Sequence, residues 1–123
     1  MRRPLLLAAV LLVALPIGLA AHLKLARSEP AAAAMLRVPP ARVQLWFTEE
    51  PVLPFSRLTL TGPSGVVALG AVKAGNERSL VADVPSKLVP GRYRLAWRTA
   101  GDDGHAVDGA LDFAVAKPAP PQP

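Results

Sequence analysis

Apolar and polar residues alternate along several short stretches of the chain beyond its N-terminal segment. Apolar side chains occupy every second position in these stretches, as in Val43, Leu45 and Phe47, which is the pattern of a β-strand with one buried face. Clusters of glycine and proline, such as residues 62–65 and Pro90-Gly91, separate the stretches and predict turns. The expected strands are residues 42–48, 57–61, 66–72, 80–84, 92–98 and 108–116.

About seven short strands at spacings of roughly 8 to 12 residues are typical of an antiparallel β-sandwich or barrel. The fold class is therefore predicted to be all-β. Helical periodicity is weak, and only Ala31 to Met35 could form a helical turn. Gly70 is expected to form a bulge, and Trp46 is expected to be partly exposed because it lies on the face opposite Val43 and Leu45. Arginines of residues 92–98 are expected to form cross-strand ion pairs with Asp108 and Asp112.

The first 21 residues have the pattern of a secretory signal peptide rather than of a folded element. Two arginines precede an almost wholly apolar stretch, Leu5 to Leu15, and small residues follow it. The alternative is an uncleaved membrane anchor, but the apolar segment is interrupted by Pro16 and is shorter than the roughly 20 residues that span a bilayer. General secretion is favoured over twin-arginine export. Cleavage after Ala20 fits the small-residue rule slightly better, whereas cleavage after Ala21 places His22 at the mature N-terminus.

The overall composition excludes several classes of function. Without Arg2 and Arg3 the net charge falls from +5 to +3, and the basic residues form no cluster, so we expect no nucleic-acid partner. The chain has no cysteine, which excludes disulfides and thiolate metal sites, and its only methionine beyond the leader is Met35. Residues 117–123 form a proline-rich tail without core-forming residues, which we predict to be disordered.

The two histidines are the strongest candidates for chemistry. An N-terminal His22 would offer its α-amine and its ring Nδ1 as a six-membered chelate. In an extended segment, residues two positions apart point to the same side, so Asp103 and His105 could both address the same ion. Three nitrogens and one oxygen suit Cu(II), whose binding should weaken as these nitrogens become protonated. On spacing alone, Asp103-Gly104 also fits an ordinary hairpin turn with an exposed histidine.

Other functional residues are less well supported. Asp102 or Glu49 could hydrogen-bond a ring N–H of a ligating histidine. The sequence has no Ser-His-Asp arrangement with a nucleophile elbow, no glycine-rich phosphate loop, and no paired carboxylates in a predicted cleft. We therefore expect a binding protein and no enzyme.

Four segments of the chain resemble the periplasmic copper-resistance proteins called CopC. Residues 22–30 are similar to that family's opening, a histidine followed by Leu, Ser and Pro. Residues 45–52 resemble its Leu-x-Phe-Ser-Glu-x-Val stretch. Residues 90–98, followed by residues 103–109, resemble its most distinctive block, Pro-Gly-x-Tyr-x-x-x-Trp-Arg, then Asp-x-His and a glycine four residues on. The resemblance covers nearly all of the chain from His22 to about Val115.

The resemblance implies a Greek-key β-sandwich or barrel over residues 22–116 that binds one Cu(II). It implies that His22 provides amine and imidazole, Asp103 a carboxylate oxygen and His105 an imidazole, and it favours cleavage after Ala21. Glu49 matches a glutamate near the site in some members. Some members carry a methionine-rich loop for Cu(I), whereas residues 65–77 contain no methionine.

The resulting hypothesis is an exported, periplasmic and monomeric Cu(II) carrier or buffer that passes copper to a membrane transporter. The chain ends without a further apolar segment, so we expect a free-standing module rather than a fusion with a membrane importer. Two alternatives remain. A metal-free, immunoglobulin-like interaction module would leave His105 as a turn residue, and an exported copper oxygenase would oxidise a polysaccharide when a reductant is present.

Overall fold

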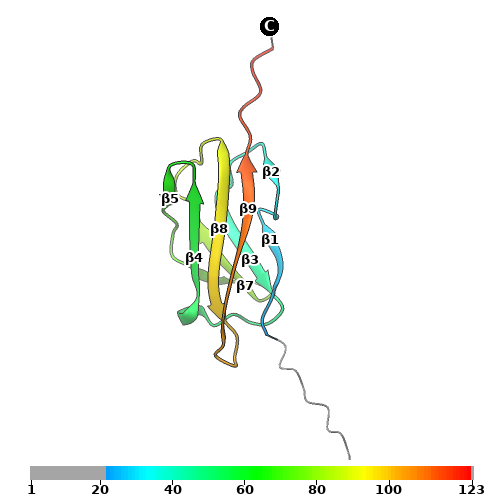
Figure 1. The fold of residues 1–123 in the computed structure, drawn as a ribbon, viewed down its shortest axis with the longest axis vertical. Helices are drawn as coiled ribbons and strands as arrows, with labels where there is room; N and C mark the ends of the chain where they lie inside the picture. The colour runs from blue at the N-terminus through cyan, green and yellow to red at the C-terminus, as the bar shows by residue number, and fades with distance from the viewer. Residues whose placement is uncertain (1–21, 123) are drawn as a thin grey trace, which may run out of the picture.

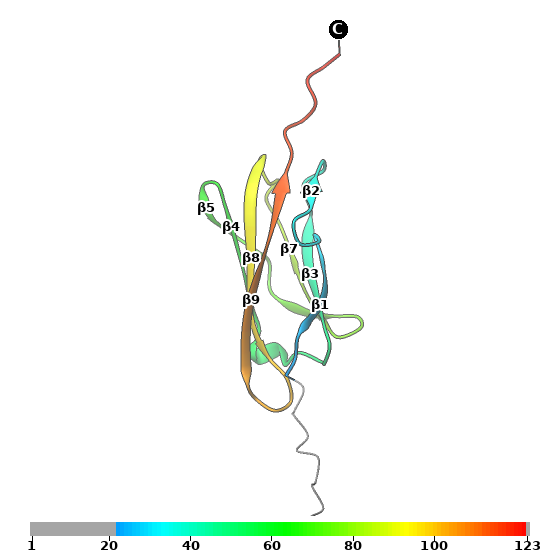
Figure 2. The same ribbon diagram turned by 45° about the vertical axis from the view of Figure 1, so that its right-hand side comes forward.

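Two β-sheets packed face to face form the protein (Figures 1 and 2). Their strands pair antiparallel, except that the short strand Met35–Leu36 pairs in parallel with the C-terminal strand Ala106–Val115. This computed structural model describes residues 22–122, so the predicted leader and both candidate cleavage sites lie outside the described residues. The all-β prediction is confirmed. The described residues contain no helix with the length and apolar character needed to span a membrane.

The strand order places consecutive segments of the chain on alternate sheets. One sheet has the order β1-β3-β7-β6 and the other the order β2-β9-β8-β4-β5, so the chain changes sheet at each step from β1 to β4, and again between β5 and β6 and between β7 and β8. This is a Greek-key arrangement of the immunoglobulin type. The bounds are Leu25–Glu29 (β1), Met35–Leu36 (β2), Arg42–Phe47 (β3), Leu53–Phe55 (the 3-10 helix η1), Arg57–Gly62 (β4), Gly65–Val67 (β5), Lys73–Gly75 (β6), Ser79–Asp83 (β7), Gly91–Ala100 (β8) and Ala106–Val115 (β9).

The core lies between the sheets and consists of the alternating apolar residues. Each strand turns every second side chain inward, and the two inner faces exclude water from these side chains. Burial of apolar surface is the main favourable term in folding. The buried residues with no more than 3% exposure include Val43, Leu45, Phe47, Leu60, Leu80, Leu88, Tyr93, Leu95 and Phe113.

The prediction that Trp46 is partly exposed was wrong. Its side chain does lie on the outer face of β3, yet only 7% of the residue is exposed. The cause is Arg27, which pairs with Trp46 in the β1–β3 register and places its guanidinium carbon 4.0 Å from the centre of the indole ring. A long cationic side chain can cover an aromatic face in this way while its charge stays in water.

Three other local predictions need correction. Residues 66–72 form a strand only as far as Val67, because the chain then crosses to the other sheet, where β6 pairs with β7. Gly70 is accordingly a loop residue rather than a bulge, and its N–H donates to the Asp83 carbonyl. Ala31 to Met35 form no helical turn, because Ala33 has a φ of 63° and Met35 enters β2.

The long β8–β9 hairpin carries the predicted cross-strand ion pairs on its outer face. Arg94 contacts Asp112 at 2.8 Å and Arg98 contacts Asp108 at 3.3 Å. The hydrogen bond from Arg94 holds the pKa of the Asp112 carboxyl below its usual value. These pairs are exposed, so they stabilise the fold little, but they mark the register that places the connecting turn at the end of the sandwich.

Two close contacts fix the conformation of this hairpin. The Tyr93 hydroxyl donates to the Val89 carbonyl at 2.6 Å, which is the tyrosine corner of immunoglobulin-type domains. Gly109 faces Trp97 across the hairpin, and a Cβ at Gly109 would overlap the indole ring.

The chain after Val115 continues as an exposed segment without secondary structure, and its disorder stays a prediction.

Candidate metal centre

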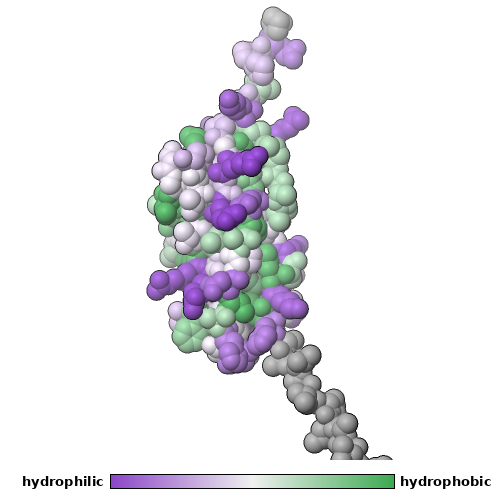
Figure 3. All heavy atoms as spheres, viewed as in Figure 1, coloured by the Kyte–Doolittle hydropathy of each residue, from purple (hydrophilic) through white to green (hydrophobic). Residues whose placement is uncertain are grey.

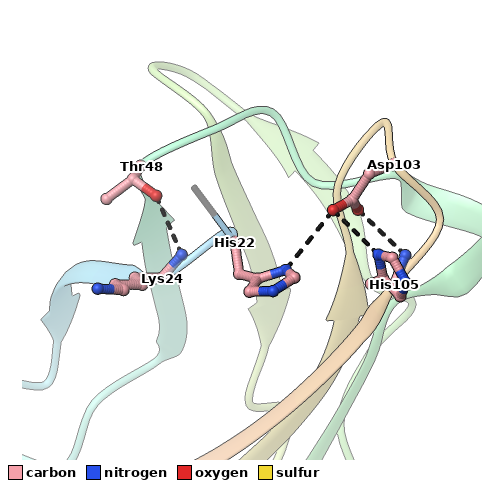
Figure 4. Close-up of polar contacts among 5 residues, drawn as sticks. All are labelled: His22, Lys24, Thr48, Asp103 and His105. Atoms are coloured by element: carbon pink, nitrogen blue, oxygen red, sulfur yellow. Dashed lines mark hydrogen bonds and ion pairs between the residues drawn. The ribbon is translucent and has the colours of Figure 1, made fainter. Parts of the chain in front are cut away.

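The two residues that follow His22, Leu23 and Lys24, are fixed to the sandwich by burial and by hydrogen bonds. Leu23 is 5% exposed and belongs to the core. The Lys24 N–H donates to the Thr48 hydroxyl at 3.0 Å, and the Thr48 N–H donates to the Lys24 carbonyl at 2.9 Å. The exposed His22 ring is therefore held at the end of the sandwich by its neighbours in the chain (Figure 4).

The β8–β9 turn holds the other two predicted ligands at the same end of the molecule. The Gly104 N–H donates to the Gly101 carbonyl at 3.0 Å, and Gly104 has a φ of 75°, a conformation that favours glycine. The His105 N–H donates to Asp103 Oδ1 at 3.0 Å. Asp103 and His105 thus face each other because a tight turn folds the chain back, not because the segment is extended as the sequence reasoning assumed.

These two chain segments bring His22, Asp103 and His105 together (Figure 4). Asp103 Oδ2 lies 3.6 Å from His22 Nδ1 and 3.2 Å from His105 Nδ1. The two imidazole rings meet edge to face, with centroids 5.6 Å apart. One ligand atom from each residue lies within 4.8 Å of the others. Ligands at about 2 Å from one ion are separated by at most about 4 Å, so small side-chain rotations close the set around a metal.

The nitrogen that His22 turns toward Asp103 is Nδ1. This is the ring nitrogen nearer to the backbone, so it is the one that forms a six-membered chelate with a free α-amine at the same residue. The orientation therefore suits an N-terminal His22.

Hydrogen bonds keep Asp103 ionised. The His105 backbone N–H and then the His105 ring lower the pKa of the Asp103 carboxyl below its usual value, with smaller contributions from the charges of His105 and His22. An ionised carboxylate is an acceptor only, and it is the form that binds a metal.

We expect this interaction to appear in the pH dependence of stability. Above the usual carboxyl pKa of about 3.9 the ionised Asp103 stabilises the folded state, and this contribution is lost as the pH falls through its lower folded pKa. Asparagine resembles the protonated carboxyl. Metal-free Asp103→Asn should therefore be less stable than the wild type at pH 6 and equally stable near pH 2, as measured by urea unfolding. A constant difference at both pH values would contradict this account.

Glu49 and Asp102, the two residues expected to hydrogen-bond a ligating histidine, differ in their contacts with the turn. Glu49 approaches the turn, since its Oε2 lies 3.0 Å from the point that a Cβ on Gly101 would occupy, and Asp103 Oδ1 lies 3.9 Å from the same point. Asp102 is exposed and takes part in none of the side-chain hydrogen bonds found in residues 22–122. Thr48 could not be identified from the sequence, because a threonine at the end of a strand carries no signal of its distant backbone partner, Lys24.

Comparisons with known proteins agree on one family. The CopC domain family matches residues 25–116. Copper resistance protein C of Xanthomonas campestris pv. juglandis is 36% identical over 103 residues, which cover 77% of this chain and 80% of that protein.

Two solved structures share the fold. CopC from Methylosinus trichosporium OB3b has a TM-score of 0.72 and 27% identity, over 82% of this chain and 99% of that chain. PcoC, a methionine-rich copper resistance protein from Escherichia coli, has a TM-score of 0.70 and 32% identity, over 77% of this chain and 99% of that chain.

Proposed function

The chain belongs to the CopC domain family, and from that premise we propose that it is an exported protein that binds one Cu(II) and acts as a copper carrier or buffer. The family and the names of its relatives support a copper-related function. The observation that carries the more specific proposal is the convergence of His22, Asp103 and His105 from opposite ends of the sequence.

The proposed ligands are the His22 α-amine and Nδ1, an oxygen of Asp103 and an imidazole nitrogen of His105. This set of three nitrogens and one oxygen suits the tetragonal preference of Cu(II). The negative charge of Asp103 would offset part of the charge of the ion. Glu49 is placed to add a weak further contact or to orient a ligand from the adjacent loop.

The site is proposed to hold copper reversibly rather than to catalyse a reaction. The proposed ligands lie on the surface, where a partner protein can reach a bound ion, and the side chain of His105 is 72% exposed. The named relative PcoC is described as methionine-rich, whereas Met35, on β2, is the only methionine among residues 22–122. We therefore propose no thioether site for Cu(I). We further propose a periplasmic location and a monomeric protein that delivers copper to a membrane transporter.

Titration of the exported protein with Cu(II) tests this function. We expect one equivalent to bind and an electron paramagnetic resonance spectrum typical of tetragonal Cu(II) with nitrogen ligands. Mass spectrometry of the same sample should give His22 as the first residue. A mature chain that begins with alanine, or the absence of binding at one equivalent, would overturn the proposal and favour the metal-free interaction module.

A further inference from the structure

A groove of about 380 Å³ lies beside the proposed copper site, between η1 and the β8–β9 hairpin. Two of its residues, Gly104 and Ala106, are the immediate neighbours of His105 in the chain. In Figure 3, hydrophilic and hydrophobic side chains adjoin near the lower end of the face formed by β4, β8 and β9. The groove is lined by Pro54, Phe55, Arg57, Arg98, Ala100, Gly104 and Ala106.

The apolar side of the groove is exposed although its backbone is fixed. Phe55, which lines the groove, is 61% exposed. The Phe55 N–H donates to the Val52 carbonyl at 3.0 Å, and the Val52 N–H donates to the Ala100 carbonyl at 2.8 Å. The phenyl ring is therefore presented to solvent from a hydrogen-bonded turn. Exposed apolar groups bordered by polar ones are typical of contact sites for other proteins.

The charged side of the groove carries more positive than negative charge. Arg57 and Arg98 are direct partners in the β4–β8 register, and like charges in that position destabilise a sheet. Asp108 pairs with Arg98 at 3.3 Å, whereas the ion pairs within residues 22–122 do not include Arg57. An external carboxylate would relieve this repulsion, because guanidinium groups bind carboxylates with paired hydrogen bonds.

We propose that this groove is the docking site for an acidic segment of the protein partner that exchanges copper with the chain. A carboxylate of the segment would lie between Arg57 and Arg98, and an apolar side chain next to it would contact Phe55. This inference rests on the proposed function, since docking here would bring the partner next to His105. The concave shape and the paired arginines fit a single inserted side chain better than the surface of a membrane.

A fluorescein-labelled pentapeptide of alternating glutamate and leucine, blocked at both ends, provides the probe. Its fluorescence anisotropy is followed during titration with the mature protein, both metal-free and loaded with one equivalent of Cu(II). We expect saturable binding that weakens at higher salt. Arg57→Glu and Phe55→Ser should each weaken it by about fivefold or more. Arg92→Glu, an identical charge change at the far end of β8, should change it by less than about twofold.

Absence of saturable binding to the wild type, or an equal loss in Arg92→Glu and Arg57→Glu, would overturn the proposal. So would binding to phosphatidylglycerol vesicles, measured by cosedimentation, that depends on Arg57 while the peptide does not bind, because the occupant would then be a membrane. Cu(II) titrations of the same variants separate the two inferences. Intact copper binding without peptide binding overturns only the docking site, whereas a wild-type protein that binds no copper overturns the proposed function.

Discussion

Replacing His105 with alanine is expected to weaken Cu(II) binding by at least about a hundredfold, since loss of a group that only supports a ligand already costs roughly ten- to a hundredfold in affinity. The fold should be unaffected, because the His105 side chain is 72% exposed and its hydrogen bond is to Asp103 in the same turn. Competition with a chelator of known affinity measures the loss, and circular dichroism checks the fold.

Asp102→Asn provides the matched control for His105→Ala. Asp102 is an exposed residue of the same turn, and none of the side-chain hydrogen bonds found in residues 22–122 involves it. We expect this variant to bind Cu(II) within about threefold of the wild type, because an exposed charge contributes little. If both variants lost affinity equally, the turn as a whole rather than the His105 ring would govern binding. Wild-type affinity in His105→Ala would refute the proposed ligand set.

Acetylation of the α-amine of the mature protein is expected to lower Cu(II) affinity by at least about a hundredfold as well. An amide nitrogen keeps its proton at neutral pH, so the chelate between the amine and His22 Nδ1 cannot form. The modification can be selective at about pH 6.5, because the reference pKa of an α-amine is about 8 and that of lysine about 10.4. Affinity and the nitrogen hyperfine pattern are measured before and after acetylation.

Mass spectrometry of peptides from the acetylated protein must show unmodified lysines, of which Lys24 is the nearest in sequence to the site. Protein acetylated on lysine but not on the α-amine, prepared by reversible protection of the amine, serves as the control and should bind normally. Unchanged affinity after acetylation of the amine would mean that the N-terminal nitrogen is not a ligand. Copper would then be bound without the amine, and the proposed set of three nitrogens and one oxygen would be wrong.

The pattern of the chain predicted the fold class and most strands for a simple reason. A strand with one buried face needs an apolar residue at every second position, and residues such as Leu45, Leu80 and Leu95 fulfil this locally. The Asp-Gly turn and the pairing of arginines with Asp108 and Asp112 are also local or nearly local features. Their physical causes act over a few residues or across one hairpin, so the sequence alone indicates them.

The sequence did not determine features that depend on contacts between remote segments. The burial of Trp46 requires Arg27 from a neighbouring strand. Strand β6 forms because its backbone groups pair with those of β7. The candidate site has the same origin. The residue types, together with the resemblance to a family, predicted His22, Asp103 and His105 as ligands. Their actual approach depends on the Lys24–Thr48 backbone contacts and on the tight turn before β9. Hydrogen bonds between segments far apart in the chain leave no periodic signal, so only the tertiary structure decides which exposed side chains meet.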